Sequence, residues 1–121
     1  MKPTFCYTTR PLAPADTARG AGETVAEIVT FRLADGTTQD AFTKAAQAME
    51  PFLIETGSMH ARVLSVDADG LWTDHLVWSS MTAAKTAAEQ IMARPEAQPF
   101  MSMIDPATVT MRHAPIRVTQ N

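Results

Sequence analysis

The sequence has little of what marks several common protein classes. It contains one cysteine, so no internal disulfide is possible, and zinc sites usually need two or more cysteines. Ten Lys and Arg residues stand against 13 Asp and Glu, a net charge of -3, which excludes the basic face of a nucleic-acid binder. No apolar run approaches the roughly 18 residues of a membrane helix, and residues 1–6 lack a signal peptide's apolar stretch. We therefore expect a cytoplasmic protein with neither nucleic-acid nor membrane partners.

What remains is enough for one packed domain. The chain has 121 residues, of which 45% are hydrophobic, and domains most often have roughly 100–150 residues. Charged residues make up 19%, slightly below the usual quarter. A smaller part of the protein surface than usual is therefore expected to face only water. Methionine is the unusual residue, with eight copies.

The N-terminal region differs from the rest of the chain. Residues 1–24 hold three of the eight prolines and two of the five glycines, a composition typical of linkers. We expect an N-terminal arm there, with a short strand possible over residues 4–9. The arm is either flexible or lies on a partner subunit. Residues 25–121 are predicted to form a single domain.

The first half of that domain predicts a strand and a helix. Val25 to Leu33 is rich in β-branched and aromatic residues, which favours a strand. Thr37 or Thr38 can then cap a helix, because its hydroxyl accepts a hydrogen bond from a free N–H of the first turn. Pro51 predicts a kink or a tightened last turn, and Gly57 suits the left-handed residue past the helix end. The apolar residues at helical spacing are Phe42, Ala45, Ala46, Met49, Phe52 and Leu53.

The second half predicts a hairpin, a helix and a last strand. Residues 58–66 and 71–80 form the hairpin, with residues 67–70 as its Asp-Gly turn. Thr82 is expected to cap the following helix. Residues 95–104 suggest a short extra helix or turn, and residues 108–118 a strand in which Pro115 implies an edge position or a bulge. The stripe of that second helix is Ala83, Ala84, Ala87, Ala88, Ile91 and Met92.

The order β-α-β-β-α-β is the split arrangement of ferredoxin-like α+β domains. Such a domain has a four-stranded antiparallel sheet with both helices on one face. Because strand residues alternate between faces, Asp74 and Trp78 share one face, which the apolar residues beside them direct toward the helices. In the last strand the more apolar set contains Met111 and His113, which should also face the helices.

The length of the hairpin loop decides which residues of the second strand face the helices. A two- or four-residue loop places Met59, Ala61 and Val63 on the Trp78 side. The same loop places His60 and Arg62 on the side of His75. A three-residue loop would exchange the two sets.

The face away from the helices is mixed, with Val77 among polar residues, whereas a sheet facing water usually alternates more cleanly. We expect a second copy of the chain to cover it through a twofold axis, giving a homodimer. His60, Arg62 and His75 would then form an anion site inside the dimer, or only interface hydrogen bonds, or Arg62 would pair with Glu27. No short ligand motif supports a metal site.

Three segments carry a resemblance to a known family. They are the first strand, residues 27–33, the third strand Asp74-His-Leu-Val-Trp-Ser79 before an alanine-rich helix, and the segment Arg94 to Ile104 before the last strand. Over about residues 24–115 the chain resembles the dimeric α+β barrel superfamily, and within it the small domains related to antibiotic-biosynthesis monooxygenases. The resemblance implies two sheets packed face to face across a dimer, often with a pocket between each sheet and its helices. Some members oxygenate aromatic polyketides without metal or flavin, some degrade haem, and some isomerise or decarboxylate small acids.

The resemblance also implies roles for particular residues. Trp78 corresponds to a pocket tryptophan that lies flat against the ligand, although a tryptophan filling the core would look the same in sequence. Haem-degrading members carry an asparagine in the first strand and a histidine in the segment that corresponds to residues 95–104. This chain has neither, and iron needs a donor from the protein, so haem degradation is not expected and no cofactor is predicted.

Cofactor-free oxygenation needs a base, an apolar pocket and a polar anchor. The candidate catalytic residues are Asp74 and His113, because histidine titrates near neutral pH and burial makes a carboxylate more basic. The alternatives are a salt bridge or cap for Asp74 and an ordinary hydrogen bond at the sheet edge for His113. The candidate substrate-binding residues are Trp78, Met49, Met59, Met92 and Phe100.

Two functions are therefore open. The first is a cofactor-independent, monooxygenase-like enzyme acting on a small apolar or aromatic molecule. The second is a non-catalytic, small-molecule-binding or stress-related dimeric barrel. A closed pocket that holds Asp74 or His113 beside Trp78 favours the enzyme, whereas a volume filled by Phe42, Met49, Met92 and Phe100 removes its site.

Overall fold

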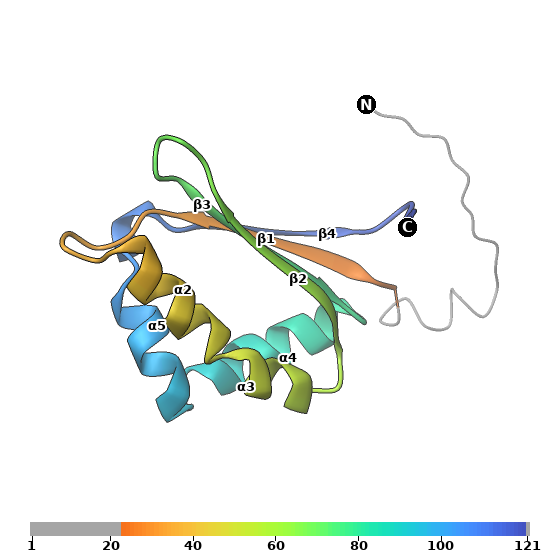
Figure 1. Ribbon diagram of the computed structural model, residues 1–121. Helices are drawn as coiled ribbons and strands as arrows, with labels where there is room; N and C mark the ends of the chain where they lie inside the picture. The colour runs from red at the N-terminus through yellow and green to blue at the C-terminus, as the bar shows by residue number, and fades with distance from the viewer. Residues whose placement is uncertain (1–22, 121) are drawn as a thin grey trace, which may run out of the picture.

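A single antiparallel sheet organises the computed structural model, which describes residues 23–120 (Figure 1). Its strands are β1 (Val25–Phe31), β2 (Met59–Val66), β3 (Trp72–Trp78) and β4 (Thr110–Pro115), arranged in the order β2-β3-β1-β4. This order and the alternation of strands with helices confirm the ferredoxin-like α+β fold. The predicted arm lies almost entirely outside the described residues, and so does the strand suggested for residues 4–9.

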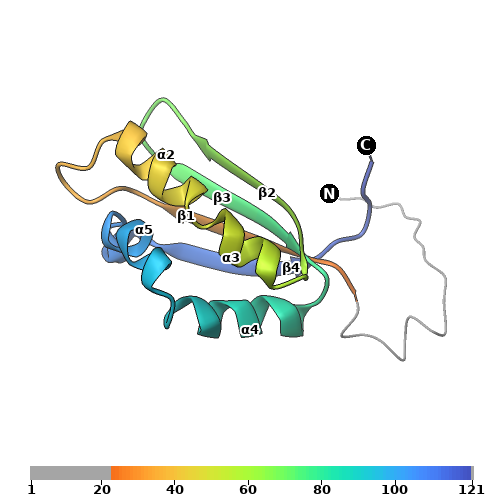
Figure 2. The same cartoon turned by 60° about the horizontal axis from the view of Figure 1, so that its bottom comes forward.

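The helices all lie on one face of the sheet (Figures 1 and 2). They are α2 (Gln39–Gln47), α3 (Glu50–Glu55), α4 (Met81–Ile91) and the short α5 (Gln98–Ser102), with single 3-10 turns at Pro95–Ala97 and Pro106–Thr108. Among the described residues, no helix is long and apolar enough to cross a membrane.

Local sequence signals explain where the first helical segment begins, bends and ends. The Thr38 hydroxyl accepts a hydrogen bond from the Ala41 N–H at 3.1 Å and so caps α2. Pro51 lies in the first turn of α3, where its missing N–H costs little, and it separates α3 from α2. Gly57 follows the end of α3 with a φ of 71°, a left-handed conformation that favours glycine. The expected kink and glycine stop are both confirmed.

Other predicted boundaries shift. Ser80, not Thr82, caps α4, because its hydroxyl accepts from the Ala83 N–H at 3.0 Å and the helix begins at Met81. The first strand ends at Phe31, and Leu33 beyond it forms only an isolated bridge to Ile104.

The last strand is shorter than predicted but has the expected position. It spans Thr110–Pro115 rather than residues 108–118. Among the described residues β4 pairs only with β1, so it is an edge strand, one of the two positions that Pro115 predicted.

The hairpin has the register of a three-residue loop. Val66 pairs with Trp72, and the Asp67 N–H donates to the Leu71 carbonyl at 3.0 Å. As a result Arg62 lies opposite Leu76, on the helix side of the sheet, which is the exchanged arrangement.

This register corrects two expectations. Ala61 and Val63 lie on the face away from the helices, and Arg62 does not join His60 and His75 there, so the predicted anion cluster does not form. A register shift between Met59 and Ala61 restores Met59 to its expected place opposite Trp78.

The core lies between the sheet and the helices. Its centre is an aromatic cluster in which the Phe42 ring lies 4.8 Å from Trp72 and 5.0 Å from Phe100, measured between centroids. Burying one such ring contributes about 1.5–3 kcal/mol relative to leaving it exposed. On α4 the buried residues are Ala84 and Ala87, whose small side chains let the helix approach the sheet closely.

Arg94 ties the segment before α5 to α3. Its guanidinium bonds Glu55 at 2.8 Å and Glu96 at 2.8 Å, and it lies over the ring of Phe52. The hydrogen bonds from Arg94 lower the pKa of both carboxyl groups below their ordinary value. This contact holds the chain that leads into α5 beside α3.

Within residues 23–120, no helix lies on the opposite face of the sheet (Figure 2). Apolar and polar residues mix on it, with Ile28 opposite His75, Ala26 opposite Val77, and Val63 60% exposed. The mixed composition predicted for this face is therefore present, although Arg62, Leu64 and Val66 belong to the other side.

Candidate functional site

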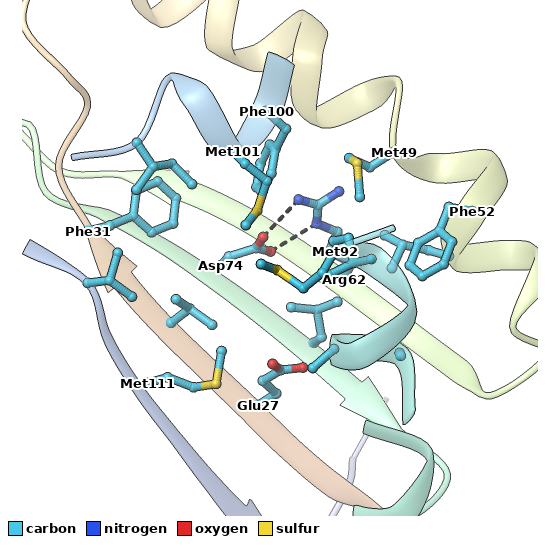
Figure 3. Close-up of a pocket in the computed structure, with 18 of the residues that line it drawn as sticks. Glu27, Phe31, Met49, Phe52, Arg62, Asp74, Met92, Phe100, Met101 and Met111 are labelled. Atoms are coloured by element: carbon cyan, nitrogen blue, oxygen red, sulfur yellow. Dashed lines mark hydrogen bonds and ion pairs between the residues drawn. The ribbon is translucent and has the colours of Figure 1, made fainter. Parts of the chain in front are cut away.

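A cavity of about 330 Å³ lies between the helix-facing side of the sheet and helices α3, α4 and α5 (Figure 3). Apolar side chains form most of its wall. The ionisable groups on the wall are Glu27, Arg62 and Asp74. An apolar cavity of this size with a few convergent polar groups is the usual form of a small-molecule site.

The cavity opens to solvent at a rim rich in methionine. Met92, Met101 and Met111 line it and are 65%, 37% and 49% exposed, while Met49 lies 1% exposed in the interior. Met92, predicted on the inward stripe of its helix, does line the cavity, but it follows α4 as the C-terminal cap residue and is exposed rather than buried. Flexible thioethers at a rim can adapt to ligands of different shape.

Phe42, Met49, Met92 and Phe100 do not fill this volume. Phe42 is fully buried in the aromatic cluster and does not line the cavity, and Phe100 stacks on it to form one wall. Met49 lies against another part of the wall, and Met92 lies at the rim (Figure 3). The volume beside Trp78 is therefore an unfilled pocket that holds Asp74, as the enzyme interpretation requires, but it opens to solvent and is not closed as expected.

Arg62 and Asp74 form a two-pronged ion pair on the cavity wall. They belong to the neighbouring strands β2 and β3, and Arg62 donates from Nε at 2.9 Å and from Nη2 at 2.8 Å to the two carboxylate oxygens. Arg62 also donates from Nη1 to the Ala46 carbonyl at 3.0 Å and lies over the Phe100 ring. Asp74 thus has the salt bridge that was one of its two interpretations, and Arg62 pairs with Asp74 rather than with Glu27.

Glu27 is the second buried carboxylate of the cavity, and it is only 7% exposed. The Trp78 indole N–H donates a short hydrogen bond to Oε1 of Glu27. His113, opposite Glu27 on β4, places its Nε2 3.7 Å from Oε2. Sequence reasoning considered Glu27 only as a partner of Arg62. The available signal was its alternation with Val25 and Phe31, which places it on the helix side.

Of the seven predicted site residues, the structure brings five together on the cavity wall. The two others lie elsewhere: His113 behind Glu27, and Met59 in a separate hollow beside Leu64 and Trp72. The five on the wall are Asp74, Trp78, Met49, Met92 and Phe100.

Metal ligands do not gather in the part of the chain that the structure describes. No group of three or more His, Cys, Asp or Glu side chains there could hold a metal ion. Over residues 23–120 the wall of the cavity includes no histidine or cysteine, so thioethers and carboxylates are its possible ligands there.

Comparison with known proteins identifies the fold. Neither family models nor curated sequences give a match to this chain. Among solved structures it is similar to SnoaB, a cofactor-independent oxygenase from Streptomyces nogalater, with a TM-score of 0.59, 17% identity and coverage of 82% of this chain and 96% of that one.

Two further structures extend the likeness. A protein of Bordetella bronchiseptica assigned to the antibiotic biosynthesis monooxygenases has a TM-score of 0.67 at 11% identity, covering 79% of this chain and 99% of that one. A dimeric ferredoxin-like protein of unknown function from Thermobifida fusca has a TM-score of 0.62 at 12% identity, covering 78% and 92%. The chain thus has the ferredoxin-like fold of the antibiotic biosynthesis monooxygenase-like dimeric α+β barrels, and the predicted resemblance is confirmed as a likeness of fold.

Proposed function

We propose that this protein is a cofactor-independent, monooxygenase-like enzyme that acts on a small, largely apolar or aromatic molecule. The observation that carries the proposal is the open apolar cavity whose wall contains two buried carboxylates, Glu27 and Asp74. The likeness to SnoaB, itself a cofactor-independent oxygenase, supports the same class, but at 17% identity it is a likeness of fold.

Cofactor-independent oxygenation requires few groups from the protein. A substrate methylene loses a proton to a base in the cavity, and the resulting carbanion passes one electron to dioxygen. The radical and superoxide combine to a peroxide, which takes up a proton and loses water, so that CH₂ and O₂ become C=O and H₂O. The apolar wall limits water at the reacting carbon, and the protein supplies a base and a polar anchor.

Asp74 and His113 remain the proposed catalytic residues, with different positions. Asp74 reaches the cavity, and Arg62 beside it has five N–H donors, of which three are used by Asp74 and Ala46. The remaining donors can bind a substrate carbonyl. His113 acts from behind Glu27. Trp78, Met49 and Phe100 provide the proposed binding wall and Met92 its rim, whereas Met59 lies outside it.

Oxygen consumption tests this proposal. Anthrone, a tricyclic aromatic ketone with one acidic methylene, is the probe, and protein-free buffer gives the spontaneous rate. We expect the protein to accelerate oxygen uptake with one ketone formed per O₂. Binding of anthrone, seen as quenching of tryptophan fluorescence, without accelerated uptake would instead identify the non-catalytic binding barrel. A haem titration is expected to give no Soret band.

We further propose a homodimer formed through the helix-free face of the sheet. That face exposes Val63 and carries Ile28 and Val77 among polar residues, and one similar structure is described as a dimeric ferredoxin-like protein. We also place the protein in the cytoplasm, because its single cysteine suits a reducing compartment.

A further inference from the structure

Glu27 and Asp74 line the same cavity but have different neighbours. Asp74 is held by the two-pronged contact with Arg62, so its negative charge is already balanced by a cation. Among residues 23–120, no Lys or Arg lies within ion-pair distance of Glu27, whose neighbours are the Trp78 N–H and His113. Both carboxylate oxygens of Asp74 accept hydrogen bonds from Arg62, whereas within residues 23–120 only Oε1 of Glu27 accepts one, so that Oε2 is left without a donor.

His113 lies where it could accept a proton from Glu27. Its Nε2 is buried and has no hydrogen-bond partner within the described part of the chain, although it lies 3.7 Å from Oε2 of Glu27. A distance of 3.7 Å is too long for a hydrogen bond, and a buried nitrogen without a partner is unfavourable. A small movement would close this gap. The His113 side chain is 21% exposed at the sheet edge, so it also reaches solvent.

We infer that Glu27 is the group that takes the substrate's proton and that His113 relays it to solvent, an inference that rests on the proposed function. The substrate C–H bond breaks, its electron pair stays on carbon, and the proton goes to Oε2 of Glu27. The proton then passes to Nε2 of His113, whose Nδ1 proton leaves to water, which restores a neutral imidazole. Trp78 is a positioning residue, because its N–H occupies Oε1 and leaves Oε2 for the transfer.

The proton-transfer step can be measured without oxygen. Anthrone in D₂O under argon exchanges its methylene hydrogens when a base removes them, and NMR follows the loss of the signal. We expect the wild-type protein to accelerate exchange and Glu27→Gln to lose this acceleration by at least about 100-fold, the usual contribution of a general base. Because the amide oxygen of the introduced glutamine can still accept from Trp78, the variant should keep its anthrone affinity, measured by fluorescence quenching, within about threefold. Glu50→Gln, at an exposed position on α3, is the matched control with unchanged exchange.

The proton transfer through His113 can be tested separately. His113→Ala should slow exchange about tenfold, and added imidazole should restore it, which a purely structural role would not allow. Exchange by Glu27→Gln at the wild-type rate would overturn the inference. Loss of exchange in Asp74→Asn together with retained exchange in Glu27→Gln would make Asp74 the base and overturn it too, as would oxygen uptake by a protein that does not accelerate exchange. Exchange under argon that is lost in Glu27→Gln, without oxygen uptake by the wild-type protein in air, would support Glu27 as the base and reject the oxygenase function.

Discussion

At the scale of single residues, the contact between Arg62 and Asp74 offers a direct test of the site's stability. Both side chains are largely buried, with 15% and 8% exposed. Arg62→Met would leave the Asp74 carboxylate without its cation, and losing one partner of a buried pair typically costs ~3 kcal/mol. We expect a lower midpoint of urea unfolding for Arg62→Met.

The double variant Arg62→Met/Asp74→Leu isolates the charge effect. Since it leaves no unpaired charge, it should recover most of the lost stability, and the two changes should not be additive. Equal destabilisation by the single and double variants would mean that Arg62 contributes only its packing on Phe100.

Predictability at this scale depended on local geometry. Asp74 and Trp78 could be placed on the helix side because strands alternate regularly. Arg62 could not, because the choice between a three- and a four-residue hairpin loop decides which side of the sheet each residue of β2 faces relative to β3. Arg62 was therefore assigned to the wrong face of the sheet, and its ion pair with Asp74 was not predicted.

At the scale of elements, the start of α4 is a sharp test of how the chain folds locally. Ser80 caps this helix through its hydroxyl, whereas Thr82 is an exposed residue inside the first turn. Ser80→Ala should destabilise the protein by about 1 kcal/mol, the usual loss for a helix cap, as measured by urea unfolding. Thr82→Ala is the matched control and should be neutral or slightly stabilising, since alanine is the better helix former. The reverse ranking would contradict this assignment.

Elements as a whole were more predictable than their ends. Period-3.6 and period-2 patterns located each main helix and strand, because burial of one face decides them. Both Ser80 and Thr82 are good cap residues, so sequence alone could not choose between them. The short α5 owes its place to contacts distant in sequence, such as the stacking of Phe100 on Phe42, and was foreseen only as a helix or turn.

At the scale of the whole molecule, the helix-free face is where the protein is expected to meet its own copy. If Val63 and Val77 are buried in a twofold interface, replacing both with lysine would bring positive charges of the two chains close together. We expect wild-type protein to have twice the 13.1 kDa mass of one chain in light scattering, and Val63→Lys/Val77→Lys to dissociate to single chains. Ile54→Lys is the control, because Ile54 is 63% exposed on the helix layer and should leave the dimer intact. A wild-type mass of one chain at micromolar concentration, or dissociation by Ile54→Lys instead, would reject this interface.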